Sequence, residues 1–206
     1  MLTYEIQEPQ TATDDAPLIV LMHGRGASRF DLEPLGSHMP QYARVVFPEA
    51  PFAGMKWGYG PGSAWYQFLG RNRPEPESFS QSLDALSELL AHFNAKRVVL
   101  GGFSQGGTMA NAYALANPAT LTGVLNFSGF LADHPRVVVD EQHVRGTSFF
   151  WGHGRHDTSI PFELAIEGRA QLSEAGATLT AHDYDIGHWI EPRELEDAIR
   201  WLTPLI

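Results

Sequence analysis

An apolar run that ends in a glycine-flanked serine constrains the fold of this chain more than any other feature. Residues 98–103 read Val-Val-Leu-Gly-Gly-Phe, which is typical of a buried strand, and the residues after Ser104 suit a helix. Gly102 and Gly106 stand two positions before and two positions after the serine. A tight strand-to-helix turn brings these two positions together, so a Cβ on either would clash. The segment therefore predicts a strand, a sharp turn and a helix, with Ser104 projecting above a sheet.

The segment Gly102–Gly106 also matches the pattern G-x-S-x-G, in which a strained turn presents a serine nucleophile. In that arrangement the N–H of Gln105 and the positive end of the following helix lie beside the serine oxygen. The alternative is a glycine-rich packing turn whose serine takes no part in chemistry. The order of strand, turn and helix favours the nucleophile.

Strand-like and helix-like patterns alternate along the whole chain. Besides an edge strand within residues 1–10, apolar or alternating runs predict strands at 18–22, 44–47, 98–103, 123–127, 147–151 and 178–184. Helical spacing and start signals predict helices from a capping box at Ser78–Gln81, over about 105–116, from Pro161 to about Glu174, and from Pro192. The polar stretch Thr11–Pro17 is expected to be a connector. This alternation predicts one α/β domain over residues 1–206, with a mainly parallel sheet and helices on both faces.

The composition excludes several classes of protein. A formal net charge of −10 argues against nucleic-acid binding and against electrostatic docking on anionic lipid. The apolar runs are too short to span a bilayer, and the first residues lack a signal-peptide pattern, so we expect a cytoplasmic protein without stable membrane association. With no cysteine, disulfides and a cysteine nucleophile are excluded. The nine histidines show no paired ligand spacing, so we expect no metal and no other cofactor.

A serine nucleophile needs a base, and the base needs an acid that holds its tautomer. The G-x-S-x-G pattern predicts the chain order serine, acid, histidine, and loops at the carboxyl ends of parallel strands should converge. Asp157 follows one predicted strand and His188 follows the next, so this pair satisfies the order. Asp133, in the loop of the preceding strand, is the alternative acid. His153 and His156 flank Asp157 and are expected to be structural or solvated.

Two further regions are expected to complete the site. The N–H of Gln105 and the turn His23–Gly26 would donate to an oxyanion, with His23 itself holding that turn. The long stretch from Pro51 to Arg73 is interrupted by glycine and proline and carries many aromatic residues. We expect Trp65 and Tyr66 to wall a substrate cleft, although the same aromatic residues could cover the edge of the sheet.

The chain resembles the α/β-hydrolases of the phospholipase/carboxylesterase group, which includes acyl-protein thioesterases. The resemblance rests on these motifs, in this order: His23–Gly26, Ser63–Tyr66, Gly102–Gly107, His153–Asp157 with Ile160–Pro161, and Gly187–His188. It implies an α/β-hydrolase fold, here without room for a separate cap domain. It also implies a triad of Ser104, Asp157 and His188, and an oxyanion hole formed by the backbone N–H groups of Arg25 and Gln105.

The chain departs from the pattern of that family at two places. Arg25 and Ala27 stand where the family often has an apolar residue and an aspartate, and Gln67 follows Trp65-Tyr66 where the family has an aspartate. Both changes lie near the expected position of an acyl chain and argue against lipidated protein substrates. The Arg25 side chain has two interpretations, recognition of an acidic substrate or pairing with a nearby carboxylate, and the small energy of exposed ion pairs favours the second.

Together these features predict a serine carboxylesterase that acts on small to medium acyl or aryl esters. Thioester or lysophospholipid hydrolysis would use the same machinery, and a catalytically inactive binding module is the rival from another class. The expected partner is a small-molecule ester substrate, and the sequence leaves a homodimer open.

Overall fold

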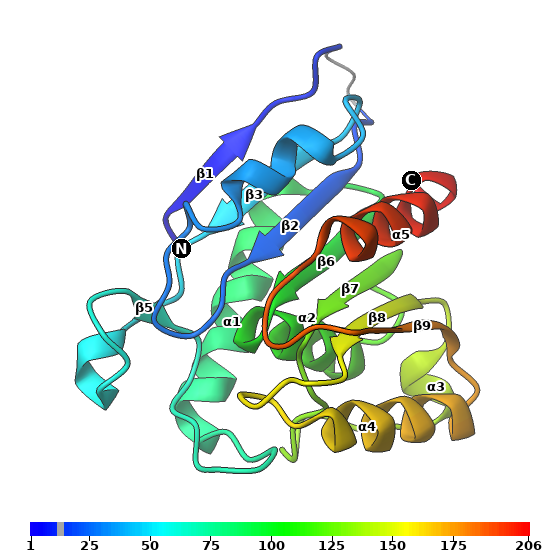
Figure 1. The fold of residues 1–206 in the computed structure, drawn as a ribbon. Coiled ribbons are helices and arrows are strands. Elements are labelled where there is room, and N and C mark those ends of the chain that lie inside the picture. The colour runs from blue at the N-terminus through cyan, green and yellow to red at the C-terminus, as the bar shows by residue number, and fades with distance from the viewer. Residues whose placement is uncertain (12–14) are drawn as a thin grey trace.

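The computed structural model describes residues 1–11 and 15–206, so the expected connector Thr11–Pro17 lies partly outside the described residues. Its centre is a seven-stranded sheet of which all neighbouring strands are parallel except the edge pair β1–β3 (Figure 1). Across the sheet the strands are β1 (Tyr4–Gln7), β3 (Arg44–Pro48), β2 (Leu18–Met22), β6 (Val98–Phe103), β7 (Gly123–Phe127), β8 (Ser148–Gly154) and β9 (Thr178–Tyr184). The mainly parallel sheet predicted from the sequence is therefore confirmed.

Helices cover both faces of this sheet (Figure 1). One face carries α1 (Pro76–Phe93), α2 (Gln105–Ala116), α4 (Phe162–Glu174) and the short α3 (Glu141–Val144). The other face carries α5 (Pro192–Leu202) and the 3-10 helix η1 (Glu33–His38), and the turn η3 (Thr203–Leu205) follows α5. Between β3 and α1 the chain forms the small hairpin of β4 (Phe52–Ala53) and β5 (Ser63–Ala64) around η2 (Gly54–Trp57). Among the described residues, no helix combines the length and the apolar character that a membrane crossing requires.

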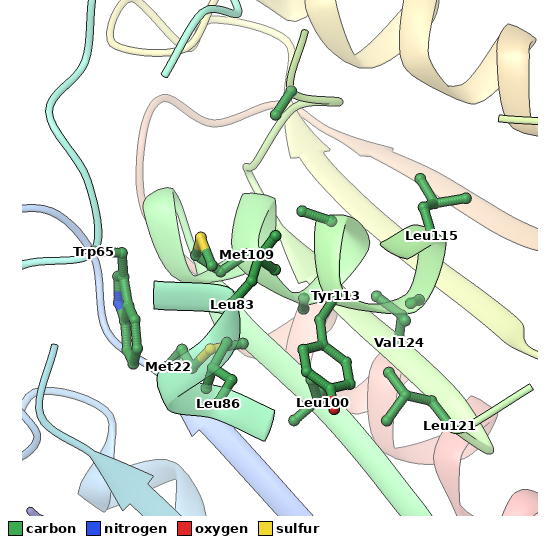
Figure 2. Packing of buried hydrophobic residues seen from close by; sticks show 14 of the residues in the cluster. Met22, Trp65, Leu83, Leu86, Leu100, Met109, Tyr113, Leu115, Leu121 and Val124 are labelled. Atoms are coloured by element: carbon green, nitrogen blue, oxygen red, sulfur yellow. The ribbon is translucent and has the colours of Figure 1, made fainter. Parts of the chain in front are cut away.

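The core is divided by the sheet into two buried clusters. Because successive side chains of a strand point to opposite faces, Val20 and Met22 join one cluster while Ile19 and Leu21 join the other. The larger cluster packs α1, α2 and α4 on the sheet and also includes Trp65 (Figure 2). Both strand faces are thus buried, which explains why β2 is a continuous apolar run rather than an alternating one.

The start of α1 differs from the prediction. The helix begins at Pro76 and not at a capping box of Ser78–Gln81. The Glu75 carboxylate accepts hydrogen bonds from the backbone N–H groups of Glu77 and Ser78, at 3.0 and 2.8 Å. Proline suits the first helical position and a carboxylate suits the positive end of the helix, so this pair displaces the expected serine cap.

Candidate active site

Ser104 occupies a sharp turn between β6 and α2. Its backbone has φ 57° and ψ −115°, a conformation that L-residues rarely adopt. A Cβ at Gly102 would lie 2.6 Å from the carbonyl carbon of Gly106, and a Cβ at Gly106 would lie 2.0 Å from the carbonyl oxygen of Met22. Both glycines are therefore required by the close approach of backbone to backbone, as the sequence pattern predicts.

The loops after β6, β8 and β9 bring three side chains into one chain of hydrogen bonds. Oγ of Ser104 lies 3.0 Å from Nε2 of His188, and Nδ1 of His188 lies 2.6 Å from Oδ2 of Asp157. Because the Asp157 carboxylate can only accept, the Nδ1–H of His188 donates to it, and Nε2 is left to accept the hydroxyl proton of Ser104. The imidazole is thus held in the tautomer that a general base for this serine requires.

The Asp157 carboxylate is fully buried and fixed on both oxygens. Oδ1 accepts hydrogen bonds from the backbone N–H groups of Ser159 and Ile160, at 2.9 and 2.8 Å, while Oδ2 accepts from His188. Burial by itself would raise the pKa of Asp157. The hydrogen bonds from His188 and from the Ile160 N–H outweigh burial, so the pKa of Asp157 lies below its ordinary value. The aspartate therefore stays ionised beside the histidine at neutral pH.

The other candidate residues lie elsewhere or play supporting parts. Asp133 is exposed, and its backbone N–H donates to the carbonyl of Asn72. His156 is exposed and contacts the exposed Asp185. His153 is buried, its Nε2 lies 2.9 Å from the Ile160 carbonyl oxygen and 3.4 Å from Oδ2 of Asp157, and burial lowers its pKa.

The turn after β2 is held in place by the small hairpin. The N–H of Gly26 donates to the Ser63 carbonyl at 2.8 Å, and the N–H of Ser63 donates to the Ala27 carbonyl at 2.7 Å. His23 is buried beneath the turn, with Nδ1 2.7 Å from the Gly24 carbonyl oxygen and Nε2 accepting the Ala50 N–H at 3.1 Å. The expectation that His23 holds this turn agrees with these contacts.

The backbone N–H groups of Arg25 and Gln105 belong to residues that line the same cleft as Ser104. Gln105 is the first residue of α2, where the helix leaves N–H groups without intrahelical partners and concentrates its positive partial charge. No described residue accepts a hydrogen bond from the Arg25 N–H, and Gln105 begins a helix, so both groups are candidate donors to an oxyanion formed in this cleft.

The Gln105 side chain has a structural role that the sequence did not reveal. Its Oε1 accepts the Trp65 N–H at 3.0 Å, and its Nε2 donates to the Tyr66 carbonyl oxygen at 2.9 Å. These two hydrogen bonds attach the aromatic stretch to the residue that follows the serine.

The expectation that Trp65 walls the cleft is wrong. Its side chain is fully buried in the cluster with Met22 and Leu86, and its indole N–H donates to the His23 carbonyl at 2.9 Å (Figure 2). The indole is held in the core because its N–H finds a carbonyl partner there, and its ring packs near the ring of His23. Tyr66 does line the cleft, although its ring is also buried and packs edge-on against Phe79.

The cleft has a volume of about 460 Å³ and spans the carboxyl edge of the sheet above Ser104. One half is formed by residues that belong to the core of the α1–α2 face, namely Tyr66, Phe68, Phe130 and Ile160. The other half is formed by residues that pack with the core of the α5 face, namely Leu32, Leu35, Phe103 and Ile190. Ligands of open α/β sheets bind at this edge, so the cleft has the expected position for a substrate.

A mainly parallel sheet in which a central strand turns through a strained serine into a helix defines the α/β-hydrolase fold. Within that fold, a family model described as Phospholipase/Carboxylesterase matches residues 3–206, and the chain belongs to this family.

Individual relatives carry esterase and thioesterase names. The chain is 27% identical to acyl-protein thioesterase 1 of Emericella nidulans, over 91% of this chain and 90% of the relative. It is 29% identical to a probable inactive carboxylesterase of Oryza sativa subsp. japonica, over 96% of this chain and 89% of the relative. Among solved structures, the carboxylesterase of Bacillus cereus has a similar fold, with a TM-score of 0.84, 20% identity, and coverage of 100% of this chain and 95% of that chain.

Proposed function

We propose that this protein is a serine hydrolase that cleaves carboxylic esters with small to medium acyl or aryl groups. The observation that carries the proposal is the continuous hydrogen-bond chain from Ser104 through His188 to the buried Asp157. A serine placed in a strained turn and hydrogen-bonded to a histidine of fixed tautomer is set up for nucleophilic attack.

In the proposed reaction, Oγ of Ser104 attacks the ester carbonyl carbon while Nε2 of His188 takes the hydroxyl proton. The oxyanion that forms accepts hydrogen bonds from the N–H groups of Arg25 and Gln105. As the intermediate collapses, the bond to the alcohol oxygen breaks and His188 returns the proton to the leaving alcohol. Water, deprotonated by His188, then attacks the acyl-enzyme and releases the carboxylic acid and Ser104. Asp157 stabilises the imidazolium of His188 during both acylation and deacylation, without itself becoming protonated.

The size and lining of the cleft support esters of modest size. A volume of about 460 Å³ accommodates a small-molecule substrate, and most of the wall is aromatic or aliphatic.

A thioester substrate is the second candidate function, favoured by relatives that are named acyl-protein thioesterase. Thioesters pass through the same tetrahedral intermediate and would need the same residues. One relative is named a probable inactive carboxylesterase, so a binding module without activity is the alternative that the experiment must exclude.

The decisive experiment is labelling with a neutral fluorophosphonate probe, combined with hydrolysis of p-nitrophenyl butyrate and of butyryl-CoA. The wild-type protein is expected to be labelled and to hydrolyse the ester, and Ser104→Ala is expected to lose both properties. Ser173→Ala, which removes an exposed hydroxyl from α4, serves as the matched control. Absence of labelling in a folded wild-type protein would contradict the proposal, and faster turnover of butyryl-CoA would favour the thioesterase.

A further inference from the structure

The guanidinium of Arg25 lies at the cleft and pairs with no carboxylate of the residues that the structure describes. Its Cζ is 4.8 Å from the centre of the Tyr59 ring and 5.8 Å from the centre of the Phe68 ring. None of the ion pairs formed among residues 1–11 and 15–206 includes Arg25. The sequence favoured an arginine paired with a nearby carboxylate, and the described residues do not provide that pair.

Three carboxylates of this region, those of Glu5, Glu49 and Asp31, are bound by residues other than Arg25. Arg29, four residues further along the chain, contacts the carboxylates of Glu5 and Glu49 at 2.9 and 3.4 Å. Asp31 lines the same cleft as Arg25, but its carboxylate accepts hydrogen bonds from the N–H and the hydroxyl of Ser28. The carboxylate of Asp31, the one acidic residue among the described residues that line the cleft, is therefore already bound within its own loop.

The guanidinium lies within cation–π distance of two aromatic rings, those of Tyr59 and Phe68, and the residue is exposed. A guanidinium carries its N–H donors in one plane, so a planar carboxylate can bind it in a paired arrangement. Phe68 also contacts Phe130, and both rings line the cleft half that belongs to the α1–α2 face. Arg25 thus places a positive charge beside this half, while aliphatic and aromatic side chains such as those of Leu32 and Phe103 form most of the other half.

We propose that the cleft selects esters that carry a carboxylate, and that the Arg25 side chain binds this carboxylate through paired hydrogen bonds. This inference rests on the proposed ester hydrolysis at Ser104. Arg25 is the one arginine or lysine among the described residues lining the cleft, and Asp31 lines it too. This balance suits a singly charged carboxylate better than a doubly charged phosphate. The apolar half would receive the part of the ester without the charge.

The test compares acidic and neutral esters that are matched in size. Mono-p-nitrophenyl glutarate is paired with p-nitrophenyl valerate, which places the charge in the acyl group. The second pair, 4-acetoxybenzoate and its methyl ester, places the charge in the leaving group. Rates are corrected for uncatalysed hydrolysis. The quantity measured is the ratio of kcat/KM between the acidic and the neutral member, from which any change in the backbone oxyanion donor of Arg25 cancels.

For at least one pair, Arg25→Gln is expected to lower this ratio by about ten- to hundredfold, since a hydrogen-bonded contact between charged groups is lost. For Arg25→Lys the ratio should lie between those of the wild-type protein and Arg25→Gln, because lysine keeps the charge and loses the planar arrangement of N–H donors. Arg145→Gln removes an exposed positive charge just after α3 and should leave the ratio unchanged.

The outcomes separate this inference from the function on which it rests. A ratio that stays within about threefold in Arg25→Gln for both pairs, while Ser104 is still labelled by the neutral probe, overturns only the carboxylate site. An equal fall in Arg145→Gln would show a general effect of net charge and would also overturn it. If Ser104 of the folded wild-type protein is not labelled at all, both the proposed function and this inference are contradicted.

Discussion

The carboxylate of Asp157 orients the imidazole of His188, with Nδ1 of the histidine 2.6 Å from Oδ2 of the aspartate. The remaining oxygen accepts two backbone N–H groups of its own loop, so the carboxylate cannot rotate away without breaking them. The position of the His188 imidazole is therefore set by the loop after β8, the strand next to the one whose loop carries the histidine.

Asp157→Asn is expected to retain the fold and to lose ester turnover by about four orders of magnitude. An amide in place of the carboxylate can donate to Nδ1, which favours the wrong tautomer and removes the base from Ser104. The measurement is kcat on p-nitrophenyl butyrate, together with the melting temperature. Asp133→Asn is the matched control and should keep its activity, because the Asp133 side chain lies on an exposed loop position. A mild effect at Asp157 and a severe one at Asp133 would exchange the two assignments.

Ser104→Ala and His188→Ala should each lower kcat by about a millionfold, and the double variant should be no more than a few-fold worse than either. The reason is that the serine is a weak nucleophile without the histidine, and the histidine has no proton to accept without the serine. Additive losses in the double variant would show that the two residues act separately and would contradict the shared hydrogen bond as the source of reactivity.

The turn at Ser104 and the convergence of the three loops could be predicted because a recurring sequence pattern and the parallel sheet determine them. Gly102 and Gly106 meet each other's backbone across the turn and that of Met22 on the neighbouring strand, and parallel strands place their following loops at one edge. The positions of Ser104, Asp157 and His188 therefore follow from short-range pattern and chain order.

The residues that sequence analysis misplaced, and the buried Glu194 that it did not single out, depend on distant parts of the fold. The Trp65 backbone is attached to the turn at Ser104 by Gln105, which lies forty residues away in the chain. The carboxylate of Glu194 is buried on a helix whose neighbouring positions are charged, and no spacing rule distinguishes it from a solvated glutamate. The unpaired state of Arg25 likewise depends on which acids the fold engages elsewhere.

Truncation of two tryptophans near the site should affect different properties, stability for Trp65 and substrate preference for Trp189. Trp65 is 0% exposed and does not line the cleft, whereas Trp189 is 56% exposed and does line it. Trp65→Ala is expected to cost about 3–5 kcal/mol of the free energy of unfolding, as large core truncations do. Trp189→Ala should cost much less and should instead change the preference among p-nitrophenyl esters of different acyl length. Urea unfolding and an ester series measure the two effects, and a stable Trp65→Ala protein would contradict the assignment to the core.

Glu194 should make the stability of the protein fall as the pH rises. Its side chain is buried against Gly152, neither carboxylate oxygen has a hydrogen-bond partner among the described residues, and burial raises the pKa of Glu194 to about 8. Between its ordinary pKa and about 8, the unfolded chain has released this proton while the folded chain keeps it. The free energy of unfolding therefore decreases by up to about 1.4 kcal/mol per pH unit in that range.

Glu194→Gln removes this titration, so its stability relative to the wild-type protein should rise from pH 5 to pH 8 by more than about 1 kcal/mol. Glu196→Gln, an exposed glutamate on the same helix, is the matched control and should show no such rise. Urea unfolding of the three proteins at both pH values gives the comparison. If the two variants change in parallel with pH, then Glu194 is ionised in the folded protein, and a partner for its carboxylate must exist.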